Sequence, residues 1–363
     1  LHYPLRRQRQ MCIRDRYMAL TYNVAAVTWY TKAAEQNCPE AQCELGKCYE
    51  TGDGVGKNEA KAVELYRKAA EQGLARAQYN LGYCYKTGEG VEKDPKKAAM
   101  WYRKAAEQGL AVAQNGIGFC YDSGFGVKED AEKAVFWYYK AAEQNQVRAI
   151  FHLGDCYYYG HGVEENKDEA VKWYRKAADL GDIDAQYNLG CCYYNGEGVE
   201  KNSAKAAEWY QKSAEQGNCM AQYNLGCFYV NGEGVEKNSA KAVEWYRKSA
   251  ENGNALAQYN LGLCYEYGTG VTLSRATAAE WYRKAAEQEY ADAQYKLGLF
   301  YENGYGVTQN KEQGMQWYKK AADQGNEKAK SAIDRMQSSG MGAAVAAGAA
   351  AATVGLLWKI LRG

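Results

Sequence analysis

The sequence predicts an all-α protein, a right-handed α-solenoid of 36-residue helix–turn–helix repeats that ends in a hydrophobic Ala/Gly-rich tail. Three observations lead to this prediction: a glycine and a tyrosine each recur every 36 residues without an insertion, and every unit carries two helical patterns around a Gly-rich loop. Internal repetition of this length is typical of solenoids. The glycines are Gly46, Gly82, Gly118, Gly154, Gly190, Gly226, Gly262 and Gly298.

Each unit contains two amphipathic helices. Apolar residues recur at three- and four-residue spacing in both halves of the unit, which is the period of one helix face. One repeat cannot bury both faces by itself, so the stability must come from stacking neighbouring repeats. In one unit, Ala77, Leu81, Cys84 and Tyr85 form the first stripe, and Ala98, Trp101, Tyr102 and Ala105 form the second.

The helix ends are marked in the sequence. Gly88 and Gly90, with their equivalents, end the first helix where a positive φ is needed. A residue type that caps helix N-termini then precedes every second helix. A glycine follows the second helix in most repeats, and Asn145 and Glu289 replace it in two. The capping residues are Asn58, Asp94, Asp130, Asn166, Asn202, Asn238, Ser274 and Asn310.

The glycine inside the first helix needs a packing reason. Glycine at an interior helical position, such as Gly82, costs about 1 kcal/mol relative to alanine. Because this cost recurs in every unit, we expect a neighbouring helix to approach closely at that position. Large Trp-Tyr pairs then face small Ala and Gly residues.

The pattern Ala-x-x-x-Leu-Gly-x-x-Tyr, Gly-x-Gly-Val and Ala-x-x-Trp-Tyr-x-Lys-Ala-Ala resembles the SEL-one-like repeat of bacterial type, a relative of the tetratricopeptide repeat. The resemblance covers residues 19–336, as about eight full repeats plus partial ends. It implies an adaptor or scaffold that assembles complexes and has no catalytic activity.

The two ends of the chain depart from the repeat. Residues 1–18 have no repeat character; we interpret them as non-native sequence or as a basic arm. At the other end, residues 329–336 continue the repeat phase and predict a capping helix. Residues 337–363 form the Ala/Gly-rich tail, in which 341–361 is a candidate transmembrane helix; a low-complexity tail in water is the alternative.

Composition excludes several functions. The 45 basic and 44 acidic residues are not clustered by sign, which argues against nucleic-acid binding. Three histidines without metal-ligand spacing, and Gly-rich loops that recur in every repeat, indicate no metal, no cofactor and no enzyme. One cysteine position alternates with Phe228 and Phe300, which predicts buried, unpaired thiols in a reducing cytoplasm.

A partner surface is predicted where the repeats differ. On the first helices the variable positions are those of Asn80, Tyr83 and Thr87, which share one helix face and would line a concave surface. Carboxamides there could hold the backbone of an extended peptide, or could bond to neighbouring helices; both interpretations stay open. The candidate residues are Asn80, Tyr83, Phe119, His152, Asp155, Asn188, Asn224 and Asn260.

These observations predict a non-enzymatic protein–protein interaction scaffold whose partners are other proteins or peptides. We expect it in the cytoplasm, with the tail as a candidate membrane tether. The alternative is a secreted or envelope-associated repeat protein that acts on host or cell-wall components by binding peptides or saccharides. Nothing in the sequence indicates the oligomeric state.

Overall fold

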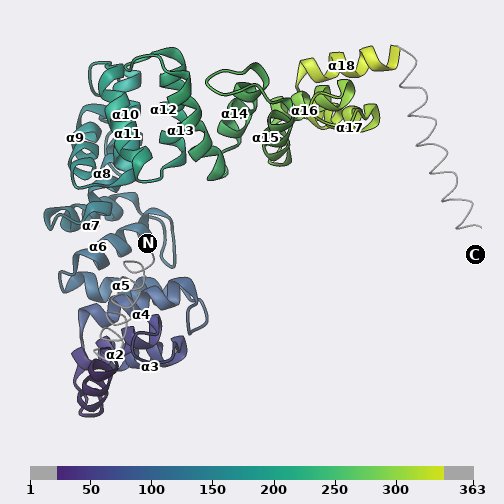
Figure 1. Ribbon diagram of the computed structural model, residues 1–363. Coiled ribbons are helices and arrows are strands. Elements are labelled where there is room, and N and C mark those ends of the chain that lie inside the picture. The colour runs from purple at the N-terminus through teal and green to yellow at the C-terminus, as the bar shows by residue number, and fades with distance from the viewer. Residues whose placement is uncertain (1–22, 339–363) are drawn as a thin grey trace, which may run out of the picture. The chain divides into compact units, whose positions relative to one another are not determined.

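The computed structural model describes residues 23–338, in which every regular element is a helix (Figure 1). The chain divides into two compact units between Asp182 and Ile183, and no break in the 36-residue step marks that division. The first unit contains a helical segment at residues 23–35, then α2 (Pro39–Thr51), α3 (Glu59–Glu71), α4 (Ala75–Thr87), α5 (Pro95–Glu107), α6 (Ala111–Asp122), α7 (Ala131–Glu143), α8 (Val147–Tyr159) and α9 (Lys167–Asp179).

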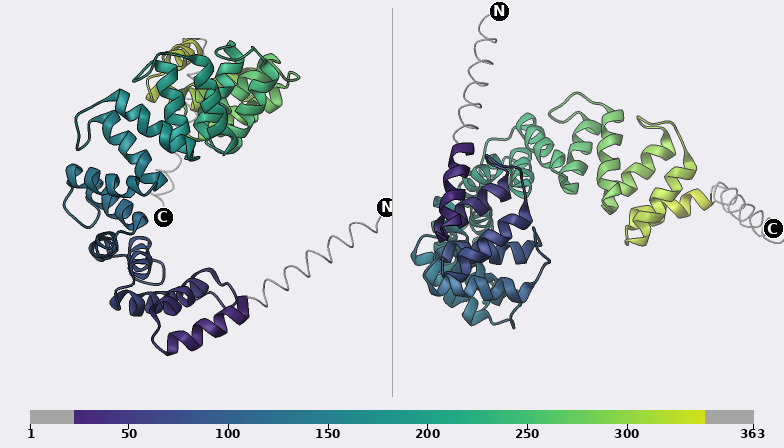
Figure 2. Two further views of the ribbon diagram at one scale, coloured as in Figure 1. Left: turned by 90° about the vertical axis from the view of Figure 1, so that its left-hand side faces the viewer. Right: turned by 90° about the horizontal axis from the view of Figure 1, so that it is seen from below.

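The second unit has the same plan. Within each unit every helix packs against the helix before it and the helix after it, as the two views of Figure 2 show. Even-numbered helices from α2 are the first helices of their repeats, and odd-numbered helices are the second. The second unit contains α10 (Ile183–Asn195), α11 (Ser203–Glu215), α12 (Cys219–Asn231), α13 (Ser239–Glu251), α14 (Ala255–Tyr267), α15 (Arg275–Glu287), α16 (Ala291–Asn303), α17 (Lys311–Asp323) and α18 (Glu327–Ser338).

The predicted helix caps are confirmed. All eight capping residues accept a hydrogen bond from the backbone N–H three residues later, as Asn58 does from Lys61 at 3.0 Å. Asn145 and Glu289, which replace glycine after the second helix, do adopt positive φ angles of 57° and 64°. Asparagine tolerates a positive φ, whereas the same conformation is strained at Glu289.

The close approach predicted at the first-helix glycine is also confirmed. A Cβ added at Gly118 would lie 2.7 Å from the Tyr138 ring of the following helix. The glycine thus lets a fully buried tyrosine lie flat against the backbone of its own repeat's first helix. Trp101 differs from the prediction, because it is only half-buried and lies under the Lys104 ammonium, 4.4 Å away.

Two further devices join one repeat to the next. The Gly126 backbone rests on the second helix of the preceding repeat, where an added Cβ would lie 1.9 Å from the Pro95 carbonyl oxygen. The buried Gln78 side chain donates to the Ala70 carbonyl of the preceding repeat at 3.1 Å and accepts from Gln108 at 2.8 Å. Because both of its polar ends are paired, its burial costs little.

The ends of the described chain agree with the prediction in part. α18 buries Ala329, Ala332 and Met336 against α17, as a capping helix should, although Ile333 is only half-buried. Residues 337 and 338, assigned to the tail, still belong to α18. The rest of the predicted tail, including 341–361, and the segment 1–18 lie outside the described residues.

Candidate binding surface on the first helices

We call the positions equivalent to Asn80, Tyr83, Lys86 and Thr87 the first-helix face, and we describe it separately in each unit. These positions lie opposite the buried stripe of their helix, and most of their side chains are half-buried or exposed. In unit 1 the face is charged and aromatic. In unit 2, from α10 to α14, it is mostly uncharged.

In unit 1, three predicted residues lie on α4 and α6. Asn80 points toward the first helix of the preceding repeat, where its amide donates to the Cys43 sulfur at 3.7 Å. Tyr83 is 39% exposed and available to a partner. The Phe119 ring is covered by the Lys86 ammonium, 4.6 Å from the ring centre, so it is not a bare aromatic anchor.

The other two predicted residues of unit 1 contact core tyrosines from α8. The His152 ring stacks on Tyr138 at a centroid distance of 4.9 Å. Asp155 accepts a hydrogen bond from the Tyr174 hydroxyl at 2.7 Å. Both side chains therefore already serve the packing between helices, whatever else they bind.

In unit 2, the three predicted asparagines occupy equivalent positions on α10, α12 and α14. The Asn224 amide lies beside the hydroxyls of Tyr187 and Tyr210 in the preceding repeat, where it opposes the rise in their pKa that burial causes. Asn260 lies beside the Tyr223 hydroxyl in the same way. A carboxamide has two N–H donors and an accepting oxygen, so it has several groups with which it could bind a ligand.

The row of tyrosine hydroxyls on this face was not predicted from the sequence. In each of the eight full repeats the second helix carries a buried tyrosine. In seven of these repeats the tyrosine hydroxyl reaches the first-helix face and donates a hydrogen bond to a side chain there. The signal was available, since a purely apolar site would accept Phe, and all eight repeats have Tyr. The bonded pairs are Tyr66–Glu50, Tyr138–Asp122, Tyr174–Asp155, Tyr210–Cys191, Tyr246–Cys227, Tyr282–Glu266 and Tyr318–Glu302.

Burial dominates the electrostatics of these phenols. It raises the pKa of Tyr282 well above its ordinary value, and the hydrogen bond to the Glu266 carboxylate raises it further. The Cys191 thiol has its pKa raised by burial too, although the hydroxyls of Tyr210 and Tyr187 act in the opposite direction. Such a thiol is protonated and unreactive at neutral pH.

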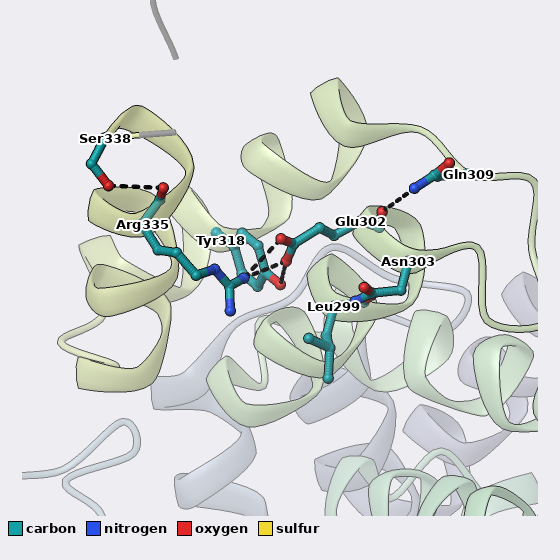
Figure 3. Close-up of polar contacts among 7 residues, drawn as sticks. All are labelled: Leu299, Glu302, Asn303, Gln309, Tyr318, Arg335 and Ser338. Carbon is teal, nitrogen blue, oxygen red and sulfur yellow. Dashed lines mark hydrogen bonds and ion pairs between the residues drawn. The ribbon is translucent and has the colours of Figure 1, made fainter. Parts of the chain in front are cut away.

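At the end of unit 2, two ion pairs lie on this face, and Figure 3 shows the one between Glu302 and Arg335. Lys296 on α16 lies 3.1 Å from the Glu266 carboxylate of the preceding repeat, and both side chains are mostly buried. Arg335 on α18 donates to both oxygens of Glu302, at 2.6 and 2.8 Å, while the Tyr318 hydroxyl donates to the same carboxylate at 2.6 Å. This group fastens the capping helix to the last full repeat.

Glu302→Gln should therefore loosen α18. The substitution removes the charge that Arg335 and Tyr318 share, and we expect α18 to lose about 1–2 kcal/mol of protection in native-state hydrogen exchange. Glu327→Gln is the matched control, because Glu327 is exposed and pairs only with Lys330, so it should change protection by less than about 0.5 kcal/mol. Equal effects of the two variants would contradict this account.

A pocket opens on the uncharged part of the face. It has a volume of about 350 Å³ and lies between α12 and α14. Cys227, Val230 and Leu263 provide an apolar lining, and Asn231 and Asn260 provide carboxamides. The complete lining is Cys227, Val230, Asn231, Tyr246, Asn260, Leu263, Cys264, Tyr267 and Thr269.

Two features are absent from residues 23–338. No group of three or more His, Cys, Asp or Glu side chains is arranged to hold a metal ion within this part of the chain. None of its helices has the length and apolar composition needed to cross a membrane.

The comparisons with known proteins agree with this architecture. The Sel1 repeat profile matches nine consecutive segments: 23–38, 39–74, 75–110, 111–146, 147–182, 183–218, 219–254, 255–290 and 291–326. The protective antigen c5321 of uropathogenic Escherichia coli is 40% identical with a TM-score of 0.77; the match covers 85% of this chain and 67% of that one. A Sel1 repeat protein from Oxalobacter formigenes is 32% identical with a TM-score of 0.66, covering 88% and 94%. No curated protein matches the chain.

Proposed function

Because this chain belongs to the Sel1 repeat family, we propose that it is a non-enzymatic scaffold that binds an extended polypeptide segment across the first-helix face of unit 2. Sel1 repeat proteins generally mediate protein–protein interactions. The single observation that carries our more specific proposal is the pocket between α12 and α14, which lies on the face where the repeats differ most in sequence.

The chemistry of this face suits a polypeptide backbone. An extended segment presents unpaired N–H and C=O groups, and the carboxamides of Asn188, Asn224 and Asn260 can both donate and accept. Each such bond contributes a net 0.5–1.5 kcal/mol or so, which makes the interaction weak unless side chains are also anchored. The pocket supplies an anchoring position beside Asn260.

The proposal is tested with peptides that are selected for binding to the full-length protein. A phage library of random peptides is panned against the full-length protein, and the selected peptides are titrated against the variant with Asn188, Asn224 and Asn260 all changed to Ala. Three lost bonds should weaken binding at least about tenfold. The matched control changes Asn202 and Asn238 to Ala, which removes helix caps, lowers stability by about 1 kcal/mol each and leaves the face intact. Unchanged affinity in the triple variant would refute the proposal.

A second candidate function is favoured by one comparison. The similarity to the protective antigen c5321 supports a secreted or envelope-associated protein that acts on host or cell-wall components. The eleven described cysteines are free thiols, which favours the reducing cytoplasm instead. Cell fractionation with the native gene would separate the two, because only the second candidate predicts the protein outside the cytoplasm.

A further inference from the structure

We propose that a segment of the chain's own tail, residues 354–361, docks in the pocket between α12 and α14 and is displaced from it by a partner. This inference rests on the proposed function and deepens it, because it names a segment that competes with the partner for the same pocket. Residues 354–361 lie outside the part of the chain that the structure describes. Four observations support the proposal: where the tail starts, how far it reaches, which side chains it carries and how it is charged.

The tail starts at the edge of unit 2 on which the pocket opens. α18 ends at Ser338, which follows Val230 of α12 by three steps of 36 residues and is therefore its equivalent. Val230 and Asn231 line the pocket from the end of α12, and Thr269 lines it from the loop after α14. Because equivalent positions of stacked repeats lie along one edge, the tail and the pocket share that edge.

The tail is long enough to reach the pocket. Four successive helix contacts lead from α14 to α18, and packed helices have axes about 8–10 Å apart, so these two helices are separated by at most about 40 Å. Residues 339–353 can span about 50 Å when they are extended. The ion pair between Arg335 and Glu302 holds the last turn of α18, from which the tail starts (Figure 3). The segment can therefore reach the pocket without a change in the repeats.

The large apolar side chains of the tail are concentrated in this segment. Residues 342–353 are mostly Ala and Gly, which have little apolar surface to bury. In contrast, six of the eight residues from 354 to 361 have large apolar side chains, whose transfer from water into a pocket is favourable. They are Val354, Leu356, Leu357, Trp358, Ile360 and Leu361.

Trp358 is the side chain that fits the pocket best. The pocket, at about 350 Å³, is small for a ligand site and suits one or two side chains. Cys227, Val230 and Leu263 make much of its lining apolar. The indole of tryptophan combines an apolar ring with an N–H donor that needs an acceptor when it is buried. The Asn231 carboxamide in the lining can be that acceptor.

The charges of the segment complement those around the pocket. The pocket lining contains no charged side chain, as suits an apolar anchor. The loop after α12, at the edge of the pocket, carries Glu233 and Glu236 against Lys237. Lys359 and Arg362 are the only charged side chains in the sequence after residue 338. Docking of Trp358 would bring these two basic side chains to the acidic loop.

Tethering makes a weak contact of this kind effective. A flexible linker of this length holds its end at an effective concentration on the order of 1 mM. A segment with an intrinsic Kd of about 0.1 mM would then be docked about nine-tenths of the time. A partner for the same pocket would bind about tenfold more weakly than it binds an open pocket. The tail would thus regulate the site that the partner uses.

The thiol of Cys227 in the pocket lining can report whether the tail is docked. The full-length protein is treated with N-ethylmaleimide, and mass spectrometry follows the rate of modification at each cysteine. We expect Trp358→Ala to raise the rate at Cys227 about fivefold or more, because the pocket is then open. Cys191 is the internal control, since it is the equivalent residue one repeat earlier and lies outside the pocket. Val345→Ala, in the Ala/Gly-rich part of the tail, is the control variant and should change neither rate.

Three outcomes would overturn the inference. An unchanged rate at Cys227 in Trp358→Ala would show that the tail does not cover the pocket. Protection of Cys227 that disappears when the protein is diluted would identify the tail of a second copy as the occupant. Flotation of the parent protein with phosphatidylcholine vesicles, together with rapid modification of Cys227, would show that a membrane takes the segment instead.

The peptides from the phage selection separate this inference from the proposed function. If the tail competes for the pocket, these peptides should bind Trp358→Ala about tenfold more tightly than the parent protein. Peptides that depend on the three asparagines but bind both proteins equally overturn the inference about the tail alone. Exposure of Cys227 in Trp358→Ala without any asparagine-dependent peptide overturns the proposed function and leaves the docking of the tail supported.

Discussion

Above about pH 10 the chain should unfold over a narrow pH interval. Seven of the core tyrosines have their pKa raised, in each case chiefly by burial: Tyr66, Tyr102, Tyr138, Tyr210, Tyr246, Tyr282 and Tyr318. Below pH 10 both states are protonated and the full stability is present. Above it the unfolded chain releases protons that the folded chain retains, so each tyrosine lowers the free energy of unfolding by about 1.4 kcal/mol per pH unit.

The measurement follows tyrosinate absorbance and helical circular dichroism together. We expect the absorbance change from the buried phenols to coincide with the loss of the helical signal, because these phenols ionise only when their repeats open. The exposed tyrosines contribute a separate rise in absorbance that leaves the helical signal unchanged. Tyr282→Phe should make the transition less steep, since it removes one of the titrating groups. Tyr159→Phe is its control, because that side chain is 71% exposed, and it should leave the transition in place. Full ionisation with the helical signal intact would contradict this explanation.

Gly118→Ala should lower the free energy of unfolding by about 2 kcal/mol, whereas Gly116→Ala, two residues earlier, should raise it by up to about 1 kcal/mol. Both glycines lie inside α6, so both substitutions bring the same gain in helix propensity. A Cβ at Gly118 would collide with the fully buried Tyr138 ring at 2.7 Å. At Gly116 it would meet the Tyr102 ring at 3.4 Å, an ordinary contact.

Urea denaturation of the two variants beside the parent chain gives the comparison. The opposite signs are the informative result, because they separate the steric effect from helix propensity within one helix. A gain in stability for both substitutions would mean that Tyr138 can move away easily. A loss of stability for both would mean that the space beside Gly116 is also too small for a methyl group.

The sequence predicts most of the fold because its signals are local. A cap such as Asn58 acts on the backbone three residues away, and Gly88 acts on its own φ angle, so both can be recognised without knowing the neighbours. The glycine at position 118 was equally informative, since an energetic cost repeated in every unit implies a close contact.

The details of the first-helix face could not be predicted in the same way. The tyrosine hydroxyl bonds to Cys191 in one repeat and to Glu266, three positions further along the helix, in another. The partner of the hydroxyl depends on which of these two positions on the first helix carries a polar side chain. That partner determines in turn which side chain of the next repeat can pair with it. Asn224 and Lys296 are two solutions at the same position.

The joint formed by Gly126 and the Pro95 carbonyl has a consequence for the history of the gene. Because one backbone rests on another, the fit hardly depends on which side chains the two repeats carry. Unequal recombination that duplicates or deletes whole repeats would keep the reading frame and rebuild the same joint at the new boundary. The number of repeats can therefore change without compensating substitutions at the joints. Selection can then adjust the length of the surface offered to a partner one repeat at a time.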